Sequence, residues 1–288
     1  MWFYLALATA LFTSFYDVIM KAMSKKVDIY LLIWSWVIFP LPFFIIFLCK
    51  TGWPDIYPGF FVALAGSTVI LFFASIFYIK AISSSPLSVT MPMLTFTPLF
   101  LLFTSWLMLN ERPRGIGLVG VLLIVVGSYV LNIKDRSEGY LAPWKNLIKQ
   151  KGPKYMLIVA VLYSVGANLD KIGVVNSSPA AWIVSIHSSL SIIFTIVLMK
   201  KGRNVLDEMV RYWPYLVGIG LCTALALICQ MSAIKLTIVP YLIAIKRTSV
   251  IFTSLLGFLF FKERHMKERL IGMSIMIIGV FCVVTSGL

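Results

Sequence analysis

The sequence predicts an all-α polytopic membrane protein with ten transmembrane helices arranged as two inverted five-helix repeats. Composition is the first observation behind this fold class. Of the residues, 60% are hydrophobic and 12% are charged, whereas charged residues make up about a quarter of a typical soluble domain. The second observation is a series of apolar segments long enough to cross a bilayer. The third is a repeat that relates the two halves of the chain.

The apolar segments are predicted to be helical spans. They run from about 15 to 26 residues, which brackets the helix length needed for a hydrocarbon core of about 30 Å. Strands of a membrane β-barrel would alternate apolar and polar residues, but these segments are apolar on every face. In chain order the predicted spans are Trp2–Met20, Ile29–Cys49, Pro58–Ile79, Pro86–Leu109, Ile116–Ile133, Tyr155–Leu169, Pro179–Met199, Tyr212–Ile234, Leu236–Phe261 and Leu270–Leu288.

A long polar segment divides the spans into five and five. Residues 1–133 form the first repeat, residues 134–154 the connecting loop, and residues 155–288 the second repeat. Because each half has an odd number of spans, the second half must enter the bilayer with the opposite polarity. The predicted architecture is therefore an inverted repeat, which is typical of alternating access.

The two halves match at fixed offsets. Adding 152 to a residue number superimposes the fourth and fifth spans on the ninth and tenth, and an offset of 150 relates the starts of the halves. The paired glycines are expected to let helices approach closely. The matched residues are Ala81 with Ala233, Ile82 with Ile234, Glu111–Arg112 with Glu263–Arg264, Gly120 with Gly272, Gly127 with Gly279, Ser14 with Ser164, and Lys21 with Lys171.

Charge and cysteine usage exclude several classes of protein. The net charge of +14 comes from Lys and Arg in short connections between apolar segments, so we expect no nucleic-acid partner. These cations concentrate after the first, third, fifth, seventh and ninth spans, which by the positive-inside rule places both termini outside the cytoplasm. The four cysteines have no ligand spacing. The sequence also has no P-loop, nucleophile elbow or HExxH motif, so we expect no catalytic residues, metal or cofactor.

The repeated segments also resemble a known family. The stretch "IKRTSVIFTSLLGFLFFKER" followed by "GMSIMIIGV", with its partner "LTFTPLFLLFTSWLMLNER" followed by "GVLLIVVGS", is similar to the EamA family of the drug/metabolite transporter superfamily. The resemblance covers essentially the whole chain. It implies a basket of helices around a central cavity, lined by the fourth and ninth spans. It also implies a transporter, because members export amino acids and other metabolites and relatives carry sugar phosphates or nucleotide sugars.

Two adjacent cations, Lys246 and Arg247, lie near the middle of the ninth span. A charge at the centre of a membrane helix is disfavoured by about 2.5 to 3.5 kcal/mol on insertion scales, so the pair needs a function or a partner. Ser249 and Thr253 follow Lys246 at helical spacing and form one polar face with it. The fourth span offers Thr90 and Thr97, together with prolines at 92 and 98 that are expected to kink it. Cations and hydroxyls around one site suit an anion.

The resemblance points in the same direction. Plant-type sugar-phosphate/phosphate translocators of the superfamily carry a Lys-Arg pair on the ninth helix that holds phosphate, and Lys246 and Arg247 stand at the matching place. Arg binds two phosphate oxygens with its planar fork, while Lys acts as a point charge. The alternative is structural: the two cations neutralise Asp17 or Asp170 and only hold helices together.

Other polar residues in the spans are candidates for the site, and each also has a structural interpretation. Asn168 could bind substrate or a neighbouring helix, His187 could be a cavity ligand or an interhelical hydrogen bonder, and Tyr241 could wall the cavity. Asp17 precedes Lys21 by four residues, the favourable order for a helical ion pair. Asp170 and Lys171 are also possible ion-pairing residues, although adjacent residues do not face each other.

Together these features predict a secondary transporter that moves a small anionic metabolite, including a phosphorylated one, across the cell (inner) membrane by alternating access. The alternatives are a flippase for a phosphate-headed lipid carrier and an exporter of amino acids and related metabolites. The expected partners are the small-molecule substrate and membrane lipid, and the expected assembly is a monomer or homodimer.

Overall fold

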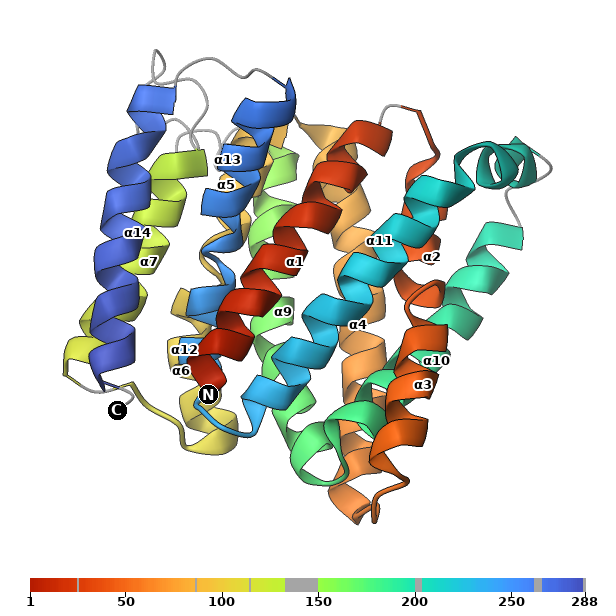
Figure 1. The fold of residues 1–288 in the computed structure, drawn as a ribbon, viewed down its shortest axis with the longest axis horizontal. Helices are drawn as coiled ribbons and strands as arrows, with labels where there is room; N and C mark the ends of the chain where they lie inside the picture. Colours follow the sequence, from red (N-terminus) through yellow and green to blue (C-terminus); the bar gives the residue numbers. More distant parts are fainter. Residues whose placement is uncertain are drawn as a thin grey trace.

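The computed structural model describes residues 1–24, 26–85, 87–113, 115–132, 150–199, 204–261 and 266–286. Every regular element in these ranges is an α-helix (Figure 1). The helices are α1 (Trp2–Met23), α2 (Ile29–Ile38), α3 (Leu41–Thr51), α4 (Pro58–Ser84), α5 (Leu87–Leu94), α6 (Thr97–Leu109), α7 (Ile116–Asn132), α9 (Lys151–Val175), α10 (Pro179–Met199), α11 (Asn204–Ile234), α12 (Val239–Lys246), α13 (Ser249–Phe261) and α14 (Met266–Ser286).

Within the described ranges, eight helical segments are long and apolar enough to cross a membrane. Two shorter apolar helices, Ile116–Leu131 and Leu270–Ser286, stand where the fifth and tenth spans were predicted. The all-helical, multi-pass membrane fold is therefore confirmed, while the count of ten crossing helices stays a prediction. Most of the predicted connecting loop, together with the far ends of the fifth and tenth spans and the residues Glu263, Arg264 and Pro86, lies outside the described residues.

Local chemistry explains where several helices begin and end. The carboxylate of Asp28 accepts a hydrogen bond of 2.8 Å from the backbone N–H of Tyr30 and so caps the start of α2. Pro58 occupies the first turn of α4, where its missing N–H costs nothing. Asn110 has a left-handed backbone with φ of 54° and terminates α6. A capping carboxylate, a proline and a left-handed asparagine therefore set the boundaries of segments that are otherwise mostly apolar.

The packing of the helices shows the inverted repeat. The three most extensive helix contacts join α7 to α14, α4 to α9, and α1 to α11, and each pair runs side by side in Figure 1. Exchanging the two repeats converts the contact between the third and sixth spans, α4 and α9, into the contact between the eighth and first spans, α11 and α1. The pair α7 and α14 is converted into itself. The contact pattern is therefore that of two halves related by a pseudo-two-fold axis.

Four glycines form the seam between α7 and α14. A Cβ atom at Gly120 would lie 2.6 Å from the carbonyl oxygen of Gly279, and one at Gly127 would lie 2.7 Å from that of Gly272. In the other direction, a Cβ atom at Gly279 would lie 2.7 Å from the carbonyl oxygen of Gly120, and one at Gly272 would lie 2.8 Å from that of Gly127. The two backbones thus approach too closely for any side chain, as expected from the spacing of seven residues. Each glycine pair faces the equivalent pair of the other repeat, running in the opposite direction.

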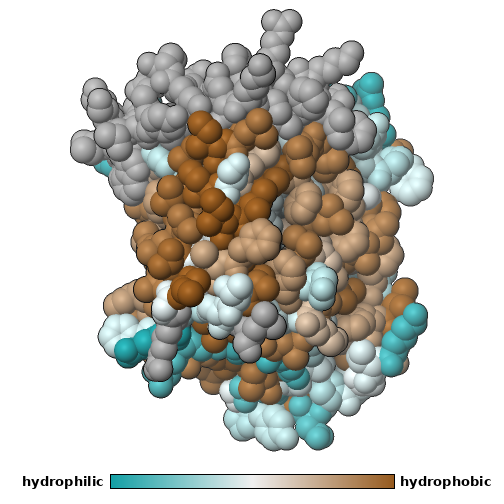
Figure 2. Space-filling model, turned by 60° about the vertical axis from the view of Figure 1, so that its left-hand side comes forward, coloured by the Kyte–Doolittle hydropathy of each residue, from teal (hydrophilic) through white to brown (hydrophobic). Residues whose placement is uncertain are grey.

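The outer surface of this seam is apolar. Figure 2 shows hydrophobic residues gathered in a belt across the middle of the face that carries α7 and α14, with hydrophilic residues towards its lower edge. Val119, Ile278 and Phe281 belong to this exterior and are 51%, 56% and 68% exposed. Exposed apolar side chains at this density have a favourable environment in lipid.

Candidate functional site

The fourth and ninth spans are each interrupted near their middle. α5 gives way to α6 at Thr95–Phe96, and α12 gives way to α13 at Arg247–Thr248. The two interruptions are 152 positions apart, which is the offset of the sequence repeat. Broken helices with this symmetry commonly build the binding sites of transporters at the centre of the membrane. The cations singled out from the sequence therefore lie at one of two equivalent breaks.

The backbone tightens at both breaks. The N–H of Thr95 donates to the carbonyl of Pro92 at 3.2 Å, and the N–H of Thr248 donates to that of Ile245 at 2.9 Å. Both bonds span three residues, the spacing of a 3₁₀ turn, so the regular α-helical ladder stops here. The kink predicted for the fourth span is confirmed, and Pro92 and Pro98 flank it. The break in the ninth span has no proline beside it and was not predicted.

Lys246 and Arg247 point to different neighbours. Lys246 Nζ donates to Gln230 Oε1 on α11 at 2.6 Å, and Arg247 Nη2 donates to Thr97 Oγ1 on α6 at 2.8 Å. Consecutive helical residues project about 100° apart, which accounts for the divergence. The Thr97 hydroxyl donates in turn to the carbonyl of Leu94 at 2.7 Å. The arginine at one break thus binds the threonine that begins the helix after the other break.

The partners of the two cations are neutral. In the described part of the chain, no carboxylate lies within 4 Å of either one, and the buried Nε–H of Arg247 has no hydrogen-bond acceptor. The side chains of both residues are half-buried. Much of their positive charge is therefore not compensated by direct contact with the protein.

Acidic and phenolic groups surround the cations at longer range. Asp17 on α1 interacts electrostatically with both Lys246 and Arg247, and Arg247 also interacts with Tyr16 and Tyr163. On α4, Tyr78 interacts with Tyr163 and Asp17. We refer to Tyr16, Asp17, Tyr78, Tyr163, Lys246 and Arg247 as the central cluster. Its members come from α1, α4 and α9 as well as from the end of α12, so both repeats contribute to it.

The remaining hydroxyls predicted for the site have varied surroundings. Ser249 is 6% exposed in the first turn of α13, and Thr90 is fully buried on α5. The buried Oγ1 of Thr253 has no hydrogen-bond partner among the described atoms. Of the threonines and serine predicted for this site, Thr97 is thus the one whose contact with the cation pair is direct.

Three further predicted residues, Asn168, His187 and Tyr241, make contacts between helices. Asn168 on α9 accepts a hydrogen bond from Ser105 Oγ at 2.6 Å and donates to Thr104 Oγ1 at 3.0 Å, both on α6. His187 on α10 bonds the carbonyl of its own helix at Ile183, and its ring packs against Phe44 with centroids 4.9 Å apart.

Tyr241 lies in the first turn of α12, at the opposite end of this helix from Lys246. Its hydroxyl is 2.6 Å from Ser286 Oγ on α14, and its ring stacks on Trp2 with centroids 6.4 Å apart. These contacts tie α12 to the two chain termini.

The charged residues at the end of α9 have other partners than each other. Lys171 Nζ forms an ion pair with Glu111 and donates to the carbonyl of Thr237 at 2.7 Å. The second carboxylate oxygen of Glu111 accepts a hydrogen bond of 2.8 Å from the backbone N–H of Val239. These four residues, the Glu111 network, connect the α6–α7 loop of the first repeat to α9 and the α11–α12 connection of the second.

The two aspartates of the spans face inward. Asp170 accepts a hydrogen bond of 3.0 Å from Trp182 Nε1 and interacts electrostatically with Lys246. The charges acting on Asp17 are likewise those of Lys246 and Arg247, and its expected ion pair with Lys21 stays a prediction. Among the described residues, no three His, Cys, Asp or Glu side chains are placed to share a metal ion.

Comparison with known proteins agrees with this architecture. The model of the EamA-like transporter family matches residues 1–133 and 150–285. A crystal structure of another protein superimposes with a TM-score of 0.77 and 16% sequence identity, covering 99% of this chain and 96% of that one. That likeness shows the fold. Among curated proteins none matches the chain significantly.

The fold, with its paired broken helices, defines a multi-pass membrane protein with inverted repeats. The chain belongs to the EamA-like transporter family. It is accordingly a membrane transporter of small molecules, in agreement with the resemblance read from its repeated segments.

Proposed function

We propose that the protein is a secondary transporter that moves a small metabolite with an anionic group, such as a phosphate or a carboxylate, across the cell (inner) membrane. One observation carries this proposal. Lys246 and Arg247 lie at a helix break between the repeats, and their direct hydrogen-bond partners, Gln230 and Thr97, are neutral. A cation kept away from bulk water without a counter-ion in contact is costly, so an anionic ligand has much to gain here.

The geometry suits an oxyanion in particular. Gln230 holds Lys246 and Thr97 holds Arg247 in fixed positions, so little side-chain entropy remains to be lost on binding. The unpaired Nε–H of Arg247 is a donor for a substrate oxygen. Lys246 adds a second positive charge beside it. In this proposal Ser249 and Thr253 contribute hydroxyls from the next helix.

The proposed mechanism is alternating access around this site. Inverted repeats allow each half to adopt the conformation of the other, which exchanges an opening on one side for an opening on the opposite side. The breaks at Thr95–Phe96 and Arg247–Thr248 supply short segments where the spans can bend. The hydrogen bond from Arg247 to Thr97 joins the two breaks, so substrate bound to Arg247 is linked to both moving halves.

The test is ligand-dependent thermal stability of the purified protein. Inorganic phosphate, phosphorylated metabolites, amino acids and polyprenyl phosphates are compared, because they represent the proposed substrate and its alternatives. We expect phosphate esters or carboxylates to raise the unfolding temperature. Lys246→Gln and Arg247→Gln should each weaken binding by about 2 to 5 kcal/mol, or roughly thirty- to several-thousand-fold.

Lys50→Gln is the matched control, because Lys50 is an exposed lysine in the last turn of α3. This variant should bind like the parent protein. If the Lys246 and Arg247 variants fold and keep the ligand response and transport of the parent, the cation pair is structural and the proposed site is wrong. A response to polyprenyl phosphate with none to soluble phosphate esters would instead favour the lipid-carrier flippase.

A second candidate substrate is a zwitterion such as an amino acid. The observation that favours it is the electrostatic interaction of Asp17 and Asp170 with the cations, since both carboxylates could attract an ammonium group. Asp17→Asn separates the two candidates. It should abolish an amino-acid response while leaving a phosphate-ester response intact.

A further inference from the structure

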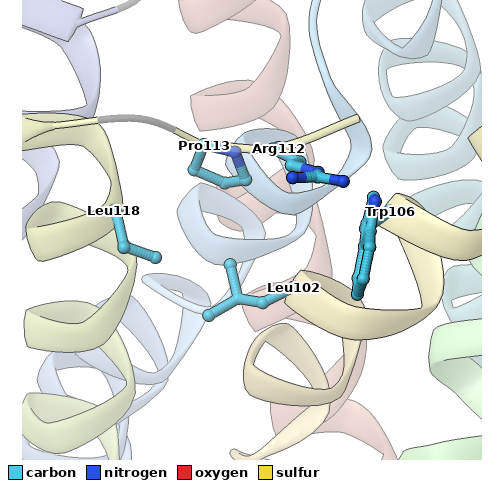
Figure 3. Close-up of a pocket in the computed structure, with 5 residues that line it drawn as sticks. All are labelled: Leu102, Trp106, Arg112, Pro113 and Leu118. Atoms are coloured by element: carbon cyan, nitrogen blue, oxygen red, sulfur yellow. The ribbon is translucent and has the colours of Figure 1, made fainter. Parts of the chain in front are cut away.

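A small pocket lies on the outside of the bundle, between α6 and α7 (Figure 3). It has a volume of 190 Å³ and is lined by Leu102, Trp106, Arg112, Pro113 and Leu118, which define the Arg112 pocket. Pockets for drug-sized ligands occupy about 300 to 1,000 Å³, so this one fits a smaller group. It is separate from the central cluster.

Arg112 gives the pocket a positive charge. Its guanidinium lies over the face of the Trp106 ring, 4.2 Å from the ring centroid, and Figure 3 shows the two side chains facing each other at one side of the pocket. Stacking uses the flat face of the guanidinium and leaves the N–H groups on its edge available. In the described part of the chain, Arg112 has no hydrogen bond or ion pair with a side chain. The edge donors therefore have no side-chain partner among the described residues.

The loop that carries Arg112 is held in place from the other side. Asn110 reverses the chain in a left-handed conformation, and the N–H of Glu111 donates to the carbonyl of Ser105 at 3.1 Å. The Glu111 carboxylate turns inward to Lys171, while Arg112 is exposed. Pro113 is buried directly after it. The position of Arg112 is thus fixed before any ligand arrives, which lowers the entropic cost of binding.

The floor of the pocket is apolar. Leu102 and Leu118 approach it from α6 and α7. Around it, Phe103, Leu107 and Val119 are 58%, 62% and 51% exposed. The pocket therefore lies where a helix end meets its loop, with a cation at the loop and hydrocarbon-compatible surface below. A phospholipid has the complementary arrangement, with a charged phosphate above and acyl chains below.

We propose that the Arg112 pocket binds the headgroup of an anionic membrane phospholipid, with the phosphate on the edge of the Arg112 guanidinium and the first part of an acyl chain against Leu102 and Leu118. Trp106 orients the guanidinium by stacking and anchors the headgroup level. The phosphate is recognised by charge-assisted hydrogen bonds, and a headgroup of net negative charge is preferred because no carboxylate of the described residues pairs with Arg112.

The test is native mass spectrometry of the full-length purified protein with added phosphatidylglycerol, phosphatidylcholine or soluble glycerol phosphate. We expect the parent protein to retain phosphatidylglycerol in preference to phosphatidylcholine, and Arg112→Gln to reduce that preference about tenfold. Trp106→Leu should also reduce it, because the guanidinium loses its platform. Arg264→Gln is the matched control. Arg264 occupies the equivalent position of the second repeat, where Phe258 replaces the tryptophan.

Each outcome either supports or overturns the proposal that the Arg112 pocket binds an anionic phospholipid. A parent protein without preference for the anionic lipid overturns the proposal, as does a preference that survives Arg112→Gln. An equal loss in the Arg264 control would show that general surface charge, and not this pocket, attracts the lipid. Displacement of bound lipid by glycerol phosphate at comparable concentration would show that the pocket takes a soluble phosphate. Loss confined to the Arg112 and Trp106 variants supports the proposal.

Discussion

Replacing Glu111 with glutamine should open one end of the transporter. The Glu111 network connects the two repeats at the end of the bundle where α9 finishes and where both termini lie (Figure 1). Glu111→Gln keeps the size of the side chain and an oxygen that can accept from the N–H of Val239. It removes the charge that pairs with Lys171. If rocking of the halves separates this end, the variant should separate more readily.

The magnitude follows from the burial of the pair. The side chains of Lys171 and Glu111 are only 16% and 13% exposed, so solvent screens their interaction little. A hydrogen bond to a charged group at such a place contributes about 1.5 to 3 kcal/mol. Loss of that amount from the closed form alone raises the open fraction roughly ten- to a hundredfold while the open form remains the minor one.

The assay is the accessibility of one cysteine. The four native cysteines are first replaced, and Thr104→Cys is introduced on α6, where Thr104 contacts Asn168 inward of the network. A membrane-impermeant thiol reagent is then added from the side that carries the termini. Its reaction rate reports the open fraction, and we expect Glu111→Gln to raise that rate in the same proportion.

Glu208→Gln supplies the control. Glu208 accepts a 2.8 Å hydrogen bond from the backbone N–H of Asp28, at the start of α2. The same substitution there removes a carboxylate from outside the Glu111 network, so it should leave the reaction rate unchanged. An unchanged rate in Glu111→Gln, in protein that remains folded, would show that the network does not restrain opening.

Three other predictions concern stability and orientation. Gly120→Ala should lower the unfolding temperature, measured by tryptophan fluorescence, because the new Cβ would lie 2.6 Å from the carbonyl oxygen of Gly279 and overpacking costs about 1 to 3 kcal/mol. The control is Gly218→Ala, whose new Cβ would have its nearest neighbour 3.5 Å away, so its stability should stay unchanged or rise by up to about 1 kcal/mol. Equal losses of stability in both variants would refute the steric argument. Asn168→Leu should cost about 1 to 3 kcal/mol in the same assay because Ser105 loses its buried acceptor; no loss would mean that the bond is dispensable. A C-terminal reporter that is active only in the cytoplasm should remain silent, and a signal would reverse the predicted orientation.

The fold could be predicted because its determinants are local or repeated. Bilayer thickness fixes the length of each apolar segment, so the predicted spans agree with the helices to within a few residues over most of the chain. The glycine spacing of seven residues predicted close helix contact, and Pro92 and Pro98 predicted the break in the fourth span. The second break was missed because the stretch around Arg247 lacks the proline that marks the first.

The neighbours of the cation pair could not be predicted in the same way. Lys246 and Arg247 were identified from their position in an apolar span, but their partners come from other helices. Which face of α11 or α6 meets them depends on helix rotation and crossing, and an apolar span carries little periodic signal for either. Gln230, a lone amide in the segment "LALICQMSAI", was a signal that could have been used. Glu111 was recognised only as part of the repeat, and its partner Lys171 only as a possible ion-pairing residue.

The seam between α7 and α14 has one more consequence. Gly120 meets Gly279 and Gly127 meets Gly272, so exchanging the two helices reproduces the same contacts. A surface that fits an inverted copy of itself is an isologous interface, the kind that holds two identical subunits together. Two copies of a single five-helix half, inserted in opposite directions, would meet through this surface as an antiparallel dimer. Joining the halves in one polypeptide fixes their stoichiometry and relative orientation, which separate copies would have to reach by diffusion in the membrane.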